Sequence, residues 1–231
     1  MRKLISSFLV LIITLVLGFS QGEQNDYDQL LQEAGGFYAS GKYGDSVDKF
    51  NELVCKYPDD ALARIGRAKI LTKMKEFDRA IEDCNEAIRV EPDSILLAVM
   101  TRGDVYVEQG SYSEAVNDFS EVLRFKKDET HAYNQRGYAY LMLGKYNEAL
   151  LDFNQAISLQ SVNRNQNPIL YKNRGYTYAM LGKRKEALAD LEKALEFSTT
   201  DSERAEIQAL IQKIKGDCKI KSRSIDYEKI L

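Results

Sequence analysis

The sequence is poor in the residues that active sites and metal centres most often need. It has a single histidine, His131, which excludes histidine-based catalytic triads and multi-histidine metal sites. It also lacks the C-x-x-C, G-x-S-x-G, P-loop and H-E-x-x-H motifs. Carboxylates are plentiful, but most fall on expected solvated faces of helices. We therefore predict that the protein is not an enzyme and that it uses no metal and no cofactor.

Positive charge is not in excess. Lysine and arginine number 32 against 35 acidic residues, which gives a net charge of −3. Loss of the first twenty residues would make the chain more acidic, because they contain Arg2 and Lys3 and no acid. Nonspecific binding to nucleic acid needs a cationic face that displaces counterions. We therefore predict no nucleic-acid partner.

Only the N-terminus has a long apolar run. It begins with Arg2 and Lys3, continues with an apolar core, and has small residues just before Gln21. This layout is typical of a secretory signal peptide, here at residues 1–20. The alternative is an uncleaved anchor, but the run at 4–19 is shorter than the roughly 20 residues of a spanning helix. We expect an exported protein, periplasmic or secreted, with no membrane span in the mature chain.

A pattern that recurs five times dominates the rest of the chain. Each copy has a small residue that we take as its anchor: Ala34, Ala68, Gly103, Gly137 and Gly175. Apolar or small residues follow every anchor at 3, 12, 16 and 19 positions, and the steps between anchors are 34, 35, 34 and 38 residues. A fixed period of this length is typical of a solenoid. Such arrays build extended binding surfaces more often than catalytic pockets.

The five copies resemble the tetratricopeptide repeat, a helix–turn–helix unit of 34 residues. The segments 134–159 and 172–197 are close to the family pattern, 101–125 and 66–92 follow it nearly as well, and 34–58 is the weakest. The resemblance implies an all-α fold, a right-handed α-solenoid of about five repeats with a C-terminal capping helix. It says little about function, because the family serves many unrelated tasks.

The predicted organisation follows from these matches. Its parts are a signal peptide at 1–20, a polar linker at 21–26, a repeat domain at 27–215 and a tail at 216–231. Within that domain we place the repeats at 27–60, 61–94, 96–129, 130–163 and 168–201, and the capping helix at 202–215. We interpret the polar insertion at 160–167 as a lengthened loop between repeats, the alternative being a loop that reaches over the groove.

Turn residues and charges recur with the same period. A glycine is expected to end four of the first helices in left-handed conformation, and Lys75 stands at this place in the second repeat. One position before the anchors stand Arg67, Arg102, Arg136 and Arg174, and fifteen after them stand Asp83, Asp118, Asp152 and Asp190. The first repeat has the same pair with exchanged signs, Glu33 and Lys49. We predict ion pairs within a repeat or between adjacent repeats, since arginine meets a carboxylate with two parallel bonds.

The concave groove is the remaining candidate for a functional site. By the helical period and by the resemblance, its residues come from the first helix of each repeat. The predicted groove residues are Tyr38, Ile65, Lys69, Met100, Asp104, Asn134, Tyr138, Lys172 and Tyr176. Three of them are tyrosines, which offer a large contact area with a polar end, and exposed apolar surface usually marks a partner site.

Two functions are consistent with this groove. The first is a noncatalytic protein–protein interaction module that binds a peptide or a partner helix in it. The alternative is a structural or assembly component of a cell-envelope complex, in which the groove does not bind peptide. The identity of the partner and the oligomeric state stay open.

Overall fold

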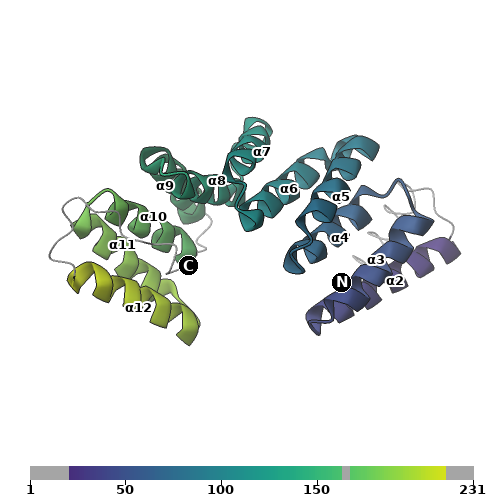
Figure 1. Ribbon diagram of the computed structural model, residues 1–231, viewed down its shortest axis with the longest axis horizontal. Helices are drawn as coiled ribbons and strands as arrows, with labels where there is room; N and C mark the ends of the chain where they lie inside the picture. The colour runs from purple at the N-terminus through teal and green to yellow at the C-terminus, as the bar shows by residue number, and fades with distance from the viewer. Residues whose placement is uncertain (1–20, 163–166, 217–231) are drawn as a thin grey trace. The chain divides into compact units, whose positions relative to one another are not determined.

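The computed structural model describes residues 21–162 and 167–216 (Figure 1). Within these ranges it contains eleven α-helices and one short 3-10 helix, and no strand. Within each of the two compact units described next, consecutive helices pack against one another, which confirms the prediction of an all-α solenoid. The signal peptide predicted at 1–20 and nearly all of the predicted tail lie outside the described residues.

The helices group into two compact units, and the boundary lies between Gln109 and Gly110. Unit 1 contains α2 (Gln21–Ala39), α3 (Tyr43–Lys56), α4 (Ala61–Lys73), α5 (Phe77–Val90), η1 (Pro92–Ser94) and α6 (Ile95–Gln109). Unit 2 contains α7 (Tyr112–Phe125), α8 (Thr130–Met142), α9 (Tyr146–Val162), α10 (Pro168–Met180), α11 (Arg184–Phe197) and α12 (Asp201–Gly216). The boundary falls in the turn of the third predicted repeat, and the units are described separately below.

The recurring positions of the sequence form the core of both units. The anchors are buried, and so are the residues 12, 16 and 19 positions after them. In unit 2, for example, a Cβ added to the anchor Gly137 would lie 2.9 Å from the ring of Phe153. An anchor must therefore be small because a bulky side chain of the second helix packs directly on it.

The turns between paired helices follow the predicted chemistry. The turn glycines have φ angles of 72° to 86°: Gly41, Gly110, Gly144 and Gly182. Lys75 takes the same left-handed conformation, with φ of 62°, at a cost of about 1 kcal/mol relative to glycine. The start of α4 has a side-chain cap, because the Asp60 carboxylate accepts from the backbone N–H groups of Leu62 and Ala63.

The predicted linker at 21–26 is wrong, because α2 already begins at Gln21. The side chain of Gln24 is buried, and Lys56 of α3 forms an ion pair with Asp26 at 2.6 Å. These contacts with α3 extend the first helix by more than a turn. The first residues of the loop predicted at 160–167 are also helical, because α9 continues to Val162.

Candidate functional site

The predicted charge pairs fix each first helix against its second helix. The shortest N–O distances are 2.6 Å for Arg67–Asp83, 2.8 Å for Arg136–Asp152 and 2.7 Å for Arg174–Asp190. In all three, Nε and Nη2 of the arginine donate to the two carboxylate oxygens. The exchanged pair Lys49–Glu33 also forms, at 3.1 Å. The prediction is confirmed for these four; Arg102 and Asp118 lie in different units, and their pairing stays a prediction.

Each arginine has a further acceptor in the second helix of the preceding repeat. The acceptors of the Nη1 group are Asn51 for Arg67, Asn85 for Arg102, Ser120 for Arg136 and Asn154 for Arg174. We did not predict these bonds, although a short polar residue recurs seventeen positions after four of the anchors. Hydrogen bonding to Asp152 raises the pKa of Arg136 above its usual value, so the guanidinium of Arg136 stays charged. Each of these arginines thereby joins its first helix to the second helix of the preceding repeat.

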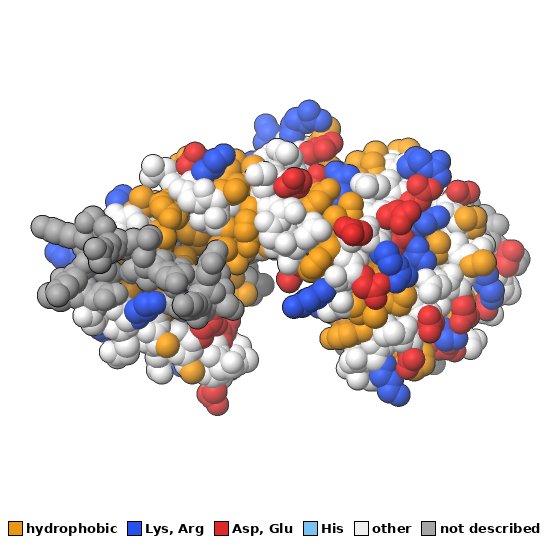
Figure 2. Space-filling model, in the orientation of Figure 1, with side chains coloured by type: hydrophobic (Ala, Val, Ile, Leu, Met, Phe, Trp, Pro, Cys, Tyr) orange, Lys and Arg blue, Asp and Glu red, His pale blue; other side chains and the backbone are white. Residues whose placement is uncertain are grey.

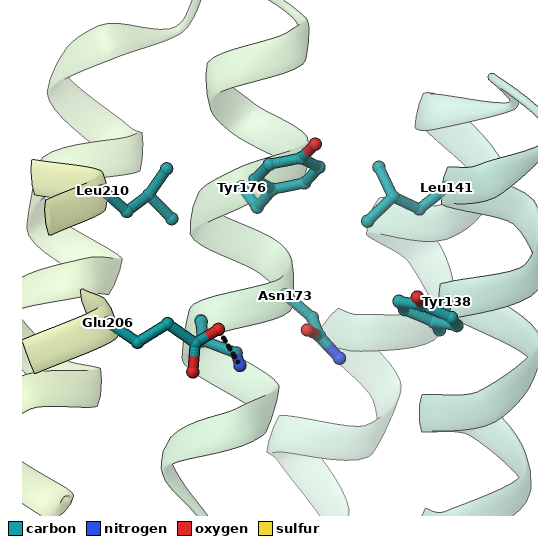
Figure 3. A pocket seen from close by; sticks show the side chains of 7 residues that line it. Tyr138, Leu141, Asn173, Tyr176, Glu206 and Leu210 are labelled. Carbon is teal, nitrogen blue, oxygen red and sulfur yellow. Dashed lines mark hydrogen bonds and ion pairs between the residues drawn. The ribbon is translucent and has the colours of Figure 1, made fainter. Parts of the chain in front are cut away.

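A pocket opens on the face that the first helices of unit 2 form. On the surface drawn in Figure 2, hydrophobic side chains gather over the region of α8 and α10. Figure 3 shows the pocket, which we call the unit-2 pocket, between α8, α10 and α12. It is lined by Tyr138, Leu141, Lys172, Asn173, Tyr176, Glu206 and Leu210. Its volume is about 40 Å³, which is room for the end of one side chain and too little for a typical small-molecule ligand.

One side of the unit-2 pocket is apolar. Leu141 and Leu210 are almost fully buried there, and the rings of Tyr138 and Tyr176 are half-buried against the underlying core. The ring of Tyr112 meets that of Tyr138 edge to face, with centroids 6.3 Å apart. Packing on both sides therefore restrains the tyrosines, so their orientation costs little further entropy on binding.

The other side is polar, and its groups are paired. Lys172 Nζ lies 3.0 Å from Glu206 Oε1, so the ion pair joins α10 to α12. Asn173 Nδ2 donates to Asn134 Oδ1 at 3.2 Å, which joins α10 to α8. The pocket thus combines an apolar wall with a rim of hydrogen-bonding groups, an arrangement typical of ligand sites.

The structure brings together the predicted residues of unit 2. Tyr138, Lys172 and Tyr176 line the pocket, and Asn134 is bonded to a lining residue. The rings of the two tyrosines are half-buried, whereas the groove prediction implies open side chains. Glu206 and Leu210 belong to the predicted capping helix and were not among the predicted site residues.

The predicted residues of unit 1 are less uniform. Tyr38 and Lys69 are exposed, and Met100 and Asp104 are half-buried. Ile65 is wrong as a groove residue, since only 2% of it is exposed. It packs with Ala61, Ala87 and Ala98, whose small side chains let the neighbouring helices close over it.

Two features are absent from the part of the chain that the structure describes. No group of three or more histidine, cysteine, aspartate or glutamate side chains in residues 21–162 and 167–216 is placed to hold a metal ion. In the same part of the chain, no helix has both the length and the apolar character needed to cross a membrane.

The fold defines a helical-repeat protein, and the first helices α8 and α10 line its unit-2 pocket together with α12. Sequence profiles described as tetratricopeptide repeat match residues 31–94, 131–161 and 171–199, and one described as TPR repeat matches 103–144. The chain therefore belongs to the tetratricopeptide repeat family. Tetratricopeptide repeats imply a scaffold for protein–protein interaction, and proteins of this fold are generally noncatalytic.

Known proteins are similar to part of the chain. DnaJ homolog subfamily C member 3 of Homo sapiens is 28% identical over 123 residues, which are 53% of this chain and 24% of that protein. The rat Sperm-associated antigen 1 is 34% identical over 92 residues, 40% of this chain and 10% of that protein. The chain thus spans a quarter or less of these relatives.

Among solved structures, a tetratricopeptide repeat protein from Parabacteroides merdae superposes with a TM-score of 0.69 at 24% identity. The match covers 83% of this chain and 73% of that one. At this identity it shows the fold alone.

Proposed function

We propose that unit 2 binds a peptide segment of a partner protein, and that one apolar side chain of this segment enters the unit-2 pocket. The observation that carries the proposal is the lining itself, in which two tyrosines and two leucines from three helices surround a hollow of side-chain size. Contiguous apolar surface on the accessible face of a solenoid is typical of partner sites.

The pocket offers an apolar surface for the peptide side chain and hydrogen-bonding groups for the peptide backbone. Burial of an apolar side chain between the tyrosine rings removes hydrophobic area from water. The amide of Asn173 and the ion pair Lys172–Glu206 at the rim can hydrogen-bond the peptide backbone on either side of the anchor. The tyrosines are held by their own core contacts before binding, which favours affinity through preorganisation.

The test compares two pairs of tyrosines in the same helices. A peptide is first selected from a random 12-residue phage library on the wild-type protein, and its affinity is measured by fluorescence anisotropy. Replacing Tyr138 and Tyr176 together by alanine should weaken binding about 30-fold or more, the effect of losing roughly 2 kcal/mol at an aromatic hot spot.

The matched control replaces Tyr140 and Tyr178 by alanine. These two are half-buried as well, but they are not among the residues that line the pocket and lie near Lys145 and Lys183 instead. With helicity retained at 25 °C, the control should bind like wild type. Equal loss in both double variants, or no loss in either, would refute the pocket as the binding site.

The alternative is a structural component of a cell-envelope complex, whose contacts do not use the pocket. It is favoured if no peptide is enriched and the Tyr138/Tyr176 variant still assembles with its native partners. Both functions include the proposed export of the chain to a bacterial envelope. N-terminal sequencing of the protein from its native host should begin near Gln21, and an intact Met1 in the cytoplasmic fraction would contradict export.

A further inference from the structure

The helix α12 continues the repeat register although it was predicted only as a cap. Lys172 and its partner Glu206 are 34 residues apart. The same spacing relates Tyr176 to Leu210, and it relates the turn glycine Gly182 to Gly216 at the end of α12. Helix α12 therefore occupies the place of the first helix of a sixth repeat.

The two residues that α12 contributes to the unit-2 pocket lie at the same repeat positions as residues that line it from the fourth and fifth repeats. Leu210 stands one position after its anchor place, as do Tyr138 and Tyr176, and it completes the apolar wall. Glu206 stands three positions before that place, as Lys172 does in the fifth repeat. A helix that only covered the core would not need to continue the repeat at both of these positions.

We infer that α12 is a third wall of the ligand site, and that Glu206 determines which charge the site accepts beside the apolar anchor. The inference rests on the proposed function. The side chain of Lys172 is only 22% exposed, whereas that of Glu206 is 48% exposed. Lys172 alone would present a positive charge to the peptide next to an apolar pocket. The carboxylate of Glu206 neutralises it, so the site selects a peptide whose anchor and neighbouring residues are uncharged.

The same random 12-residue phage library tests this inference on four proteins. They are wild type, Glu206→Gln, Lys172→Gln, and the exchange variant Lys172→Glu/Glu206→Lys. Glu206→Gln leaves Lys172 without its carboxylate and should enrich aspartate or glutamate beside the anchor. Lys172→Gln should enrich lysine or arginine. The exchange variant restores a neutral pair and should show the wild-type preference.

A matched control corrects for overall charge. Glu192→Gln removes one acid from α11, at an exposed residue that lines a separate hollow between α11 and α12. It should select the same peptides as wild type. A synthetic peptide with one aspartate beside the anchor should bind Glu206→Gln about fivefold tighter than wild type at low salt, and the gain should shrink as salt screens the interaction.

The outcomes separate the two proposals. Peptides enriched by wild type, with the same charge preference in Glu206→Gln and Glu192→Gln, would overturn the role of Glu206 and leave the proposed function standing. Failure of every variant and of wild type to enrich any peptide would overturn both. Should Glu206→Gln lose helicity, the exchange variant decides: a charge preference different from that of wild type would refute the pair as the determinant.

Discussion

Units 1 and 2 repeat the same helical hairpin but place opposite chemistry at the same two positions. Three places before the anchor, unit 1 has Leu31, Ile65 and Met100, and unit 2 has Asn134, Lys172 and, in the register of α12, Glu206. One place after the anchor, unit 1 has Gly35, Lys69 and Asp104, and unit 2 has Tyr138, Tyr176 and Leu210. The two units thus differ in chemistry at these positions, and in the second repeat the first position is used by the core, where Ile65 is buried.

The consequence is visible on the surfaces of the two units. In Figure 2, acidic and basic side chains are interspersed over unit 1, whereas the region of α8 and α10 in unit 2 shows more hydrophobic surface. The aromatic row of unit 2 lines a pocket, while in unit 1 the large apolar residue Ile65 is used in the core. Binding through an anchored side chain is therefore expected of unit 2.

The largest expected effect comes from breaking an ion pair. Asp152→Ala in unit 2 leaves the guanidinium of Arg136, whose side chain is 19% exposed, without its carboxylate. We expect a loss of about 2–3 kcal/mol in the free energy of unfolding, measured by urea denaturation. Glu33→Ala removes the more exposed partner of the exchanged pair in unit 1 and should change little. An equal loss of stability in the two variants would contradict the expected difference between the Arg136–Asp152 and Lys49–Glu33 ion pairs.

Smaller effects on stability, opposite in sign to each other, are expected when two glycines are replaced by alanine. At Gly137 an added Cβ meets the Phe153 ring at 2.9 Å, whereas at Gly35 of α2 nothing lies within 4 Å. Gly137→Ala should destabilise unit 2 by about 1–3 kcal/mol through overpacking. Gly35→Ala should stabilise unit 1 by roughly 0.5–1 kcal/mol through helix propensity. Thermal unfolding followed by circular dichroism measures both, and stabilisation by Gly137→Ala would show that the anchor is not size-limited.

The smallest expected effect is a pH dependence of the stability of unit 1, which comes from Tyr27. Burial, together with the nearby Asp60 carboxylate, raises the pKa of Tyr27 well above its ordinary value of 10.0. The stabilisation is complete below the unfolded pKa near 10 and is lost as the pH rises toward the folded pKa. Between pH 10 and 11 the free energy of unfolding should fall by up to about 1 kcal/mol. Tyr27→Phe should remove this component, and an unchanged pH profile in that variant would contradict it.

Sequence periodicity was enough for the features that recur from repeat to repeat. The anchors, the turn glycines and the ion pairs recur at fixed spacing because the packing of the two helices within a hairpin imposes them. The burial of Ile65 was not predictable in this way, because it depends on the small residues Ala87 and Ala98 of neighbouring helices. The pocket residues Glu206 and Leu210 were missed for a different reason. Their helix was identified by its amphipathic pattern, and the 34-residue register that links them to Lys172 and Tyr176 was not used.

The hydrogen bond from each arginine to the preceding repeat has a consequence for how the chain opens. The guanidinium of Arg136 is shared by α7, α8 and α9, and that of Arg174 by α9, α10 and α11. A hairpin that detaches takes one acceptor away from the arginine of the next repeat, which keeps only the carboxylate of its own repeat, so fraying at one repeat raises the free energy of the next. The nearest-neighbour coupling of the array thus includes a hydrogen bond from a charged donor to a neutral acceptor. In hydrogen exchange, the amides of α8 to α11 should open as one cooperative unit, and Asn154→Ala should let α8 and α9 exchange separately from α10 and α11.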